Sequence, residues 1–116
     1  MYKSLNDAAK LFPELSDGST EIWYQIRNDI NFSFELPTKV VPGVTHKLLG
    51  RIRETNLGTI YYLLQGDNWS PEGEARELIM DKGLRHTSMS VGDVIRIDGK
   101  WIAVDGIGFK EISETV

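Results

Sequence analysis

Apolar residues in the second half of the chain recur at helical spacing before they begin to alternate. Ala75, Leu78 and Ile79 form a short apolar stripe with the period of a helix. Ser70 is suited to cap the start of this helix, and Gly83 follows its last turn as a stop signal. The pattern predicts a main helix at about residues 70–82.

Two short apolar runs follow, at residues 94–97 and 101–104, and the pair Asp98-Gly99 stands between them. Both central residues of the favoured two-residue hairpin turn need a positive φ, which Asp and Gly adopt readily. We predict a tight β-hairpin here. In the return segment behind it, Phe109 and Ile112 are expected to pack on the core.

The first half of the chain has weaker but similar patterns. Ser4, with Asp7 three residues later, marks the start of a short N-terminal helix that ends before Pro13. Strands are predicted at 20–27, 32–36, 46–55 and 59–65. The fold class is therefore α+β: a mostly antiparallel, twisted sheet of about five or six strands, with one main helix and a short N-terminal helix.

Composition limits the alternatives. The chain has 116 residues, no cysteine and a formal net charge of −4. This length suits a single domain over residues 1–116, with no internal repeat and no long linker. No apolar run is long enough to span a bilayer and no secretion signal stands at the start. We expect a cytoplasmic protein without a membrane partner.

The loop after the main helix is the most polar stretch of the chain, and it supplies the candidate binding residues Arg85, His86, Thr87, Ser88 and Ser90. One interpretation is structural, because hydroxyls satisfy backbone groups between a helix and a strand. A second is binding of a ligand or partner, with a cation and hydroxyls converging on it. A third is catalysis by Ser88 and His86, which would also need an orienting group and an oxyanion site.

A second candidate surface is the predicted strand at 46–55. Alternation places Leu48, Gly50 and Ile52 on one face and Lys47, Leu49, Arg51 and Arg53 on the other. The basic face is either an ordinary solvated surface or a patch for nucleic acid, phosphate or an acidic protein.

The chain has three tryptophans, at positions 23, 69 and 101. Trp101 follows the hairpin turn, and it is either an exposed hot spot for a protein partner or a cover over a sheet edge. Trp23 interrupts an outward polar row, where it either covers a neighbouring strand or is exposed to bind a partner. Trp69 precedes Ser70 in the manner of a hydrophobic staple.

Metal and cofactor signatures are missing from the sequence. The two histidines, His46 and His86, are far apart, and no carboxylate cluster has ligand spacing. Gly106-Ile107-Gly108 lacks the third glycine and the following helix of a dinucleotide-binding motif. We therefore predict neither a metal nor a cofactor.

Three segments of the C-terminal half also resemble a known group of proteins. They are SPEGEARELI from residue 70, GLRHTSMSVGDVI from residue 83 and DGKWIAVDGIGFKEI from residue 98. These segments resemble small uncharacterised proteins of phages, plasmids and other mobile elements. They are more distantly similar to the YodL-like domain, whose signature matches Ser88–Val94 and Gly108-Phe109. The family-like segment covers about residues 59–112, and the resemblance implies genomic context and fold without a catalytic assignment.

Three hypotheses for function follow. The leading one is a non-enzymatic accessory protein of a phage or mobile element that binds a host or phage protein, as a host-takeover or anti-defence modulator. The second is a nucleic-acid-binding protein that uses Lys47, Arg51 and Arg53. The third is a small hydrolase or nucleotide-modifying enzyme that uses Ser88 and His86.

Overall fold

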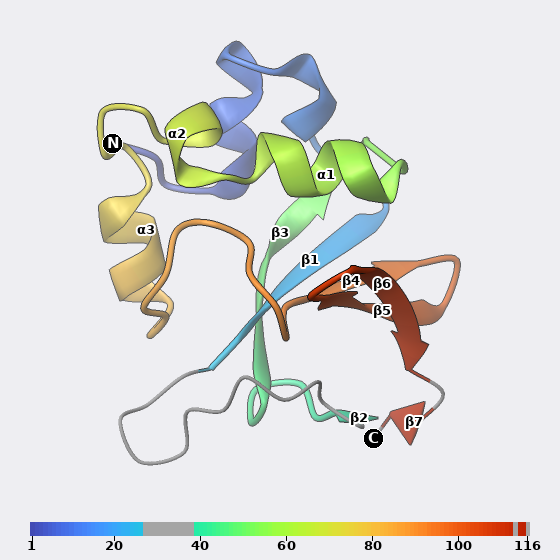
Figure 1. The fold of residues 1–116 in the computed structure, drawn as a ribbon. Coiled ribbons are helices and arrows are strands. Elements are labelled where there is room, and N and C mark those ends of the chain that lie inside the picture. Colours follow the sequence, from blue (N-terminus) through green and yellow to red (C-terminus); the bar gives the residue numbers. More distant parts are fainter. Residues whose placement is uncertain (27–38, 113, 116) are drawn as a thin grey trace.

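The computed structural model describes residues 1–26, 39–112 and 114–115 (Figure 1). In chain order the elements are η1 (Leu5–Lys10), η2 (Pro13–Leu15), β1 (Thr20–Gln25), β2 (Lys39–Val40), β3 (His46–Ile52), α1 (Leu57–Leu63), α2 (Gly66–Trp69), α3 (Arg76–Asp81), β4 (Val94–Ile97), β5 (Lys100–Asp105), β6 (Gly108–Ile112) and β7 (Glu114–Thr115). The elements η1 and η2 are 3₁₀ helices. The predicted strand at 32–36 lies outside the described residues.

Five strands form one antiparallel sheet in the order β3-β1-β4-β5-β6, and β2 and β7 pair in parallel beside it. The predicted α+β class with a mostly antiparallel sheet is confirmed. The predicted hairpin is also confirmed, because β4 pairs with β5 and Ile97 faces Lys100 across the turn. Asp98 and Gly99 have φ values of 52° and 77°, as a two-residue turn of this kind requires.

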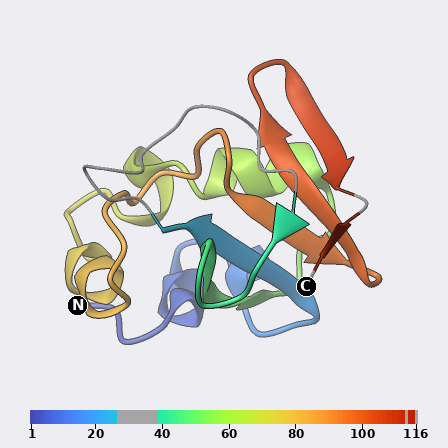
Figure 2. The ribbon, with the colours of Figure 1, turned by 90° about the horizontal axis from the view of Figure 1, so that it is seen from below.

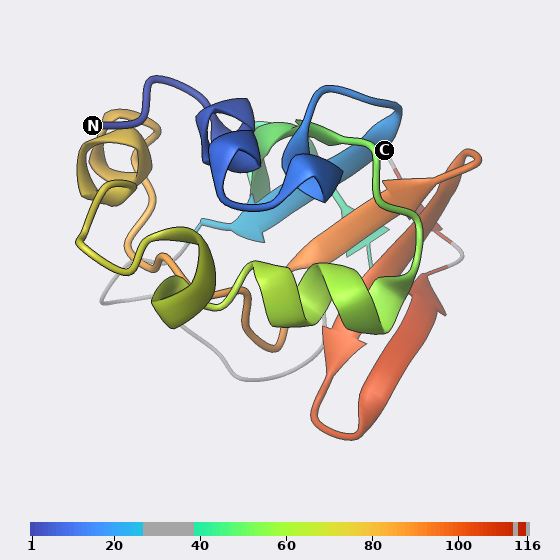
Figure 3. The same ribbon diagram turned by 90° about the horizontal axis from the view of Figure 1, so that it is seen from above.

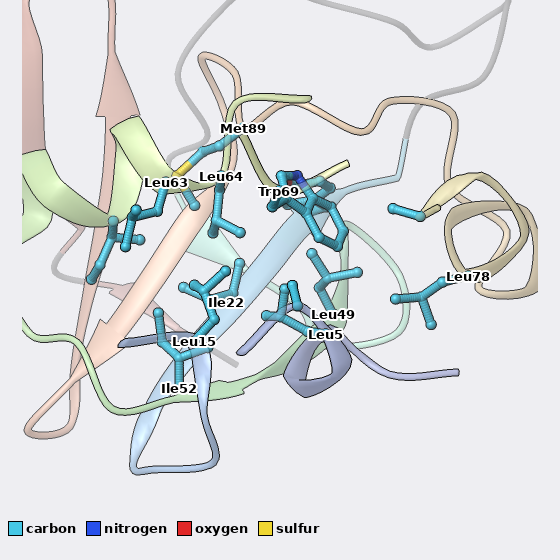
Figure 4. Close-up of a cluster of buried hydrophobic side chains, with 14 of the residues drawn as sticks. Leu5, Leu15, Ile22, Leu49, Ile52, Leu63, Leu64, Trp69, Leu78 and Met89 are labelled. Atoms are coloured by element: carbon cyan, nitrogen blue, oxygen red, sulfur yellow. The ribbon is translucent and has the colours of Figure 1, made fainter. Parts of the chain in front are cut away.

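The helices cover one face of the sheet (Figure 3), and β2 and β7 lie on the other side (Figure 2). The main core lies between the helices and the sheet, and Figure 4 shows its side chains converging from both layers. Trp69 of α2 is fully buried and stacks on Tyr2, whose hydroxyl donates to the Trp69 carbonyl at 2.8 Å. Trp69 therefore lies within the core instead of acting as a staple at a helix entrance.

The opposite face of the sheet is also buried, which decides the position of Trp101. Trp101 is only 6% exposed and packs in a second cluster with Val40, Val94, Ala103 and Ile112. The Trp23 ring meets the Trp101 ring edge-on at 5.4 Å between centroids. The exposed position considered for Trp101 is therefore wrong, because a second apolar layer covers this face. Trp23 covers neighbouring strands, in agreement with the first of its two interpretations.

The helix α1 (Leu57–Leu63) occupies most of the segment 59–65, so the predicted fourth strand is wrong. The Asn56 side chain accepts from the backbone N–H of Thr59 at 2.9 Å and begins α1. Ile60, Leu63 and Leu64 are buried at spacings of three and four residues, whereas Tyr61 and Tyr62 are exposed. The β-branched and aromatic residues favoured a strand locally, but the cap and the helical spacing of the buried residues prevailed.

The main helix is shorter than the predicted span of 70–82, since α3 covers only Arg76–Asp81. The Ser70 hydroxyl accepts from the Ala75 N–H at 2.9 Å across a turn, and it does not cap a helix at residue 71. Gly73 has a φ of +79°, which a right-handed helix does not contain. At the N-terminus the predicted short helix is present as η1, and Asp7 accepts from the N–H groups of Lys3 and Ser4.

Trp101→Ala tests whether the second apolar layer contributes to stability. Removing a buried Trp is expected to lower the free energy of unfolding by about 3–5 kcal/mol, because the transfer and cavity terms add. Tyr62→Ala, at a residue 62% exposed, should change it by less than about 0.5 kcal/mol. Urea denaturation followed by circular dichroism measures both variants, and equal effects would contradict the buried position of Trp101.

Candidate functional site

The polar loop from Arg85 to Asp93 arches from the end of α3 to the start of β4, along one end of the sheet (Figure 1). Its middle is held by Met89, which is buried in the main core and whose N–H donates to the Leu64 carbonyl at 3.0 Å. The loop is thus attached to the core near its centre as well as at its two ends.

Asp93 is the polar centre of this loop and is completely buried. Its Oδ1 accepts from the Gln25 N–H at 2.7 Å and its Oδ2 from the Ser90 N–H at 2.8 Å. The His86 Nε2 lies 3.0 Å from Oδ1 and 2.8 Å from Oδ2. Since a carboxylate accepts hydrogen bonds and does not donate them, the His86 Nε2 is the donor in this pair. One carboxylate therefore joins β1, the loop and the imidazole.

His86 is fixed by stacking as well as by its carboxylate. Its ring lies 4.6 Å from the Tyr24 ring, with 12° between the planes. The Tyr24 hydroxyl donates to the Thr87 carbonyl at 2.7 Å. Burial, together with the negative Asp93, raises the pKa of Tyr24 well above its usual value of 10.0. The Nδ1 of His86 is buried and has no hydrogen-bond partner among the residues that the structure describes.

The two serine hydroxyls of the loop bond to the backbone. The Ser88 Oγ accepts from the Gly66 N–H at 2.7 Å, and the Ser90 hydroxyl donates to the Ser88 carbonyl at 3.0 Å. The Thr87 carbonyl accepts from Trp69 Nε1 at 3.1 Å as well as from Tyr24. These contacts are the kind that the structural interpretation of the loop predicts.

The same geometry bears on the hydrolase hypothesis. A histidine and a carboxylate are paired, as a triad requires, but within the described residues no serine hydroxyl bonds to the imidazole. The imidazole nitrogen away from Asp93 is enclosed by protein. The arrangement favours a structural histidine–aspartate pair over a nucleophile and its base.

Three residues that the sequence did not connect with the loop complete this region: Tyr24, Gln25 and His46. His46 is buried, and its Nε2 lies 2.8 Å from the Gly92 carbonyl. Gly92 has a φ of +98°, and a Cβ there would collide with the Gln25 side chain. The Gln25 Oε1 is buried, and no described residue hydrogen-bonds to it. No local signal in the sequence identifies these residues, because only strand pairing brings them to the loop.

An open groove of about 490 Å³ runs between α3 and the loop. Of the predicted binding residues, Arg85 and Thr87 line it, whereas His86, Ser88 and Ser90 do not. Its other lining residues are Arg76, Ile79, Met80 and Leu84. Met80 is 68% exposed although it is apolar. The structure thus separates the five loop residues into an internal hydrogen-bonded set and a groove-lining set.

The predicted basic face of β3 is not formed as expected. The pairing of β1 with β3 shifts register between Ile22 and Trp23, and this irregularity turns Leu49 into the core at 2% exposure. Arg51 is exposed, but its guanidinium lies 3.4 Å from the Glu21 carboxylate. Lys47 is four residues away along the strand and Arg53 lies beyond its end. Leu49 therefore does not lie on the basic face of β3, and Glu21 offsets part of the positive charge of that face.

No group of three His, Cys, Asp or Glu side chains in the described part of the chain is placed to hold a metal ion. No helix in it is both long enough and apolar enough to cross a membrane.

Comparisons with protein-family models, curated proteins and solved structures found no match to this chain. The resemblance to proteins of mobile elements therefore stays a prediction.

Asp93→Asn tests the central role of the carboxylate. An amide has one acceptor oxygen, so its NH₂ group would face one of the N–H donors that Asp93 accepts from. We expect the free energy of unfolding to fall by about 2–3 kcal/mol. Asp67→Asn, at an exposed aspartate, should change it by less than about 0.5 kcal/mol. Equal urea midpoints for Asp93→Asn and the wild type would refute this role.

The raised pKa of Tyr24 predicts a loss of stability in alkali. The folded chain holds the phenolic proton more tightly than the unfolded chain, so this contribution is complete below pH 10 and is lost as the pH rises above it. In Tyr24→Phe the decline of unfolding free energy above pH 10 should be shallower than in the wild type. Denaturant titrations at pH 8–11 measure both slopes, and identical slopes would contradict the assignment.

Proposed function

We propose that this chain is a non-enzymatic accessory protein of a phage or mobile element that binds a host or phage protein. The contact surface is the groove between α3 and the Arg85–Asp93 loop. The proposal rests chiefly on one observation: His86, Ser88 and Ser90 bond to groups inside the protein, and Arg85 and Thr87 line an open groove. A loop held in this way provides a rigid wall for contact.

The lining of the groove defines the chemistry of the partner. Arg76, an exposed side chain of α3, brings a positive charge to this groove, although the whole chain has a net charge of −4. Met80 adds an exposed apolar side chain that adapts readily to different contacts. The groove is therefore suited to an acidic segment with one apolar residue, since arginine pairs well with carboxylates.

The phage or mobile-element origin is supported by the sequence resemblance over residues 70–112. A nucleic-acid partner is favoured less, because Glu21 lies beside Arg51 on the candidate basic face. The hydrolase hypothesis is favoured less because the loop hydroxyls bond to the backbone.

Charge reversal in the groove tests the proposal. Tagged protein is incubated with lysate of a host cell, and captured proteins are quantified by mass spectrometry. Arg76→Glu and Met80→Asp should each reduce capture of a specific protein by about tenfold or more, as expected for central interface residues. Crosslinking mass spectrometry of the captured complex should place an acidic segment of that protein beside α3.

Two variants serve as matched controls. Arg53→Glu makes the same charge change at another exposed arginine, and Val44→Asp alters a residue 69% exposed, close to the 68% of Met80. Both should capture the protein as the wild type does. Capture that is insensitive to the groove variants, or recovery of nucleic acid alone, would overturn the proposal.

A further inference from the structure

No other described strand pairs with the outer edge of β6. β6 is the last strand of the five-stranded sheet, and in the described part of the chain its outward backbone groups make no hydrogen bond. Most proteins protect such an edge, because it is a template for an additional strand. β6 is short and includes Lys110 and Glu111, which limits unspecific pairing.

The pairing of β5 with its neighbours shows which backbone N–H and C=O groups of β6 point to its outer edge. The Val104 N–H donates to the Asp93 carbonyl, so the backbone groups of Val104 point away from β6. The backbone groups of Ala103 and Asp105, the neighbours of Val104 in β5, point toward β6. Ala103 pairs there with Lys110, and Asp105 pairs with Gly108. Because orientation alternates along a strand, the N–H and C=O groups of Phe109 and Glu111 point to the open edge.

A pocket of about 220 Å³ lies next to this edge, between the first turn of α1 and the β5–β6 hairpin. It is lined by Gly58, Tyr61, Val104, Asp105, Gly106, Gly108 and Phe109. The Tyr61 and Phe109 rings meet edge-on across it at 6.4 Å. Ile107, at the tip of the same hairpin, is 99% exposed. The edge therefore combines free backbone groups with an apolar recess for one side chain.

We propose that β6 receives an extended segment of a partner protein as a sixth strand. The segment places an apolar side chain in the pocket beside Phe109. Two residues along, a basic side chain lies opposite Glu111, because alternate residues share one face of a sheet. The recognised chemistry is thus an extended apolar–x–basic sequence. This surface is separate from the α3 groove, although it rests on the same proposal that the chain binds proteins.

Pairing of β6 with a second copy of the chain is disfavoured by charge. The backbone groups that point to the outer edge of β6 belong to Phe109 and Glu111. In a symmetric antiparallel pair of two β6 strands, both residues form all their backbone hydrogen bonds only when Phe109 faces Glu111 of the copy. This register sets Lys110 directly opposite its own copy in a non-hydrogen-bonded pair, where side chains are closest. A foreign segment avoids this repulsion.

Synthetic peptides test the proposal without the unidentified partner. The probe is an eight-residue threonine-rich peptide with one leucine and, two residues later, one lysine. Its binding is measured by amide shifts in ¹⁵N-labelled protein and by calorimetry. We expect shifts at Phe109, Glu111 and Tyr61, and slower hydrogen exchange of the Phe109 and Glu111 amides.

Two N-methylated peptides provide the matched comparison. Methylation of the alternate peptide amides that face β6 should weaken binding about tenfold or more. Methylation of the amides that point away from β6 should keep the affinity within about threefold of that of the unmodified peptide. On the protein, Glu111→Pro removes one outward N–H and should also weaken binding, whereas Arg76→Glu should not. Melting curves show whether Glu111→Pro is folded, and the peptide pair gives the result independently of that variant.

Equal binding of the two methylated peptides, shifts confined to other surfaces, or no binding at millimolar peptide would each overturn the β6 site. A dimer that forms through β6 without peptide, detected by sedimentation, would also overturn it. Lysate capture through the α3 groove is unaffected by all these outcomes, so failure here is distinct from failure of the proposed function.

Discussion

The buried carboxylate of Asp93 is the constraint on which this end of the molecule depends. A buried carboxylate is stable only when hydrogen bonds replace the water that it has lost. Here the donors are the N–H groups of Gln25 and Ser90 and the imidazole of His86. The donors come from β1 and from two parts of the loop, so satisfying one side chain fixes the positions of several segments.

The burial of Asp93 also explains why the polar side chains of the Arg85–Asp93 loop bond to groups inside the protein. Hydroxyls and an imidazole in sequence are typical of a reaction centre, but here they bond to the backbone and to a carboxylate. Ser88 accepts from α2, Tyr24 donates to the loop, and Met89 anchors it in the core. These contacts hold the loop in one position, where Arg85 and Thr87 border the groove beside α3.

Both faces of the sheet are buried, and this removes two large aromatic side chains from the surface. Trp101 and Trp23, the aromatic residues best suited to bind a partner, pack against each other under a second layer. Among the described residues, two surfaces lie at the margins of the sheet: the groove beside α3 and the outer edge of β6. Each combines an apolar recess with polar groups of fixed position, a combination typical of binding sites.

The sequence alone determined the features that depend on neighbouring residues. These include the hairpin at Asp98-Gly99, the alternation in β1, the short N-terminal helix and the α+β class. Position 59–65 shows the limit: its residues favour a strand locally, but packing of Ile60 and Leu63 selects a helix.

Only the tertiary structure decided the contacts between distant residues. Gln25 and Asp93 are 68 positions apart and meet through pairing of β1 with β4. The irregularity that turns Leu49 inward depends likewise on its partner strand. Local patterns record propensity and period, whereas register and burial are set by the whole chain, so the sequence identified the polar loop but not the partners of its side chains.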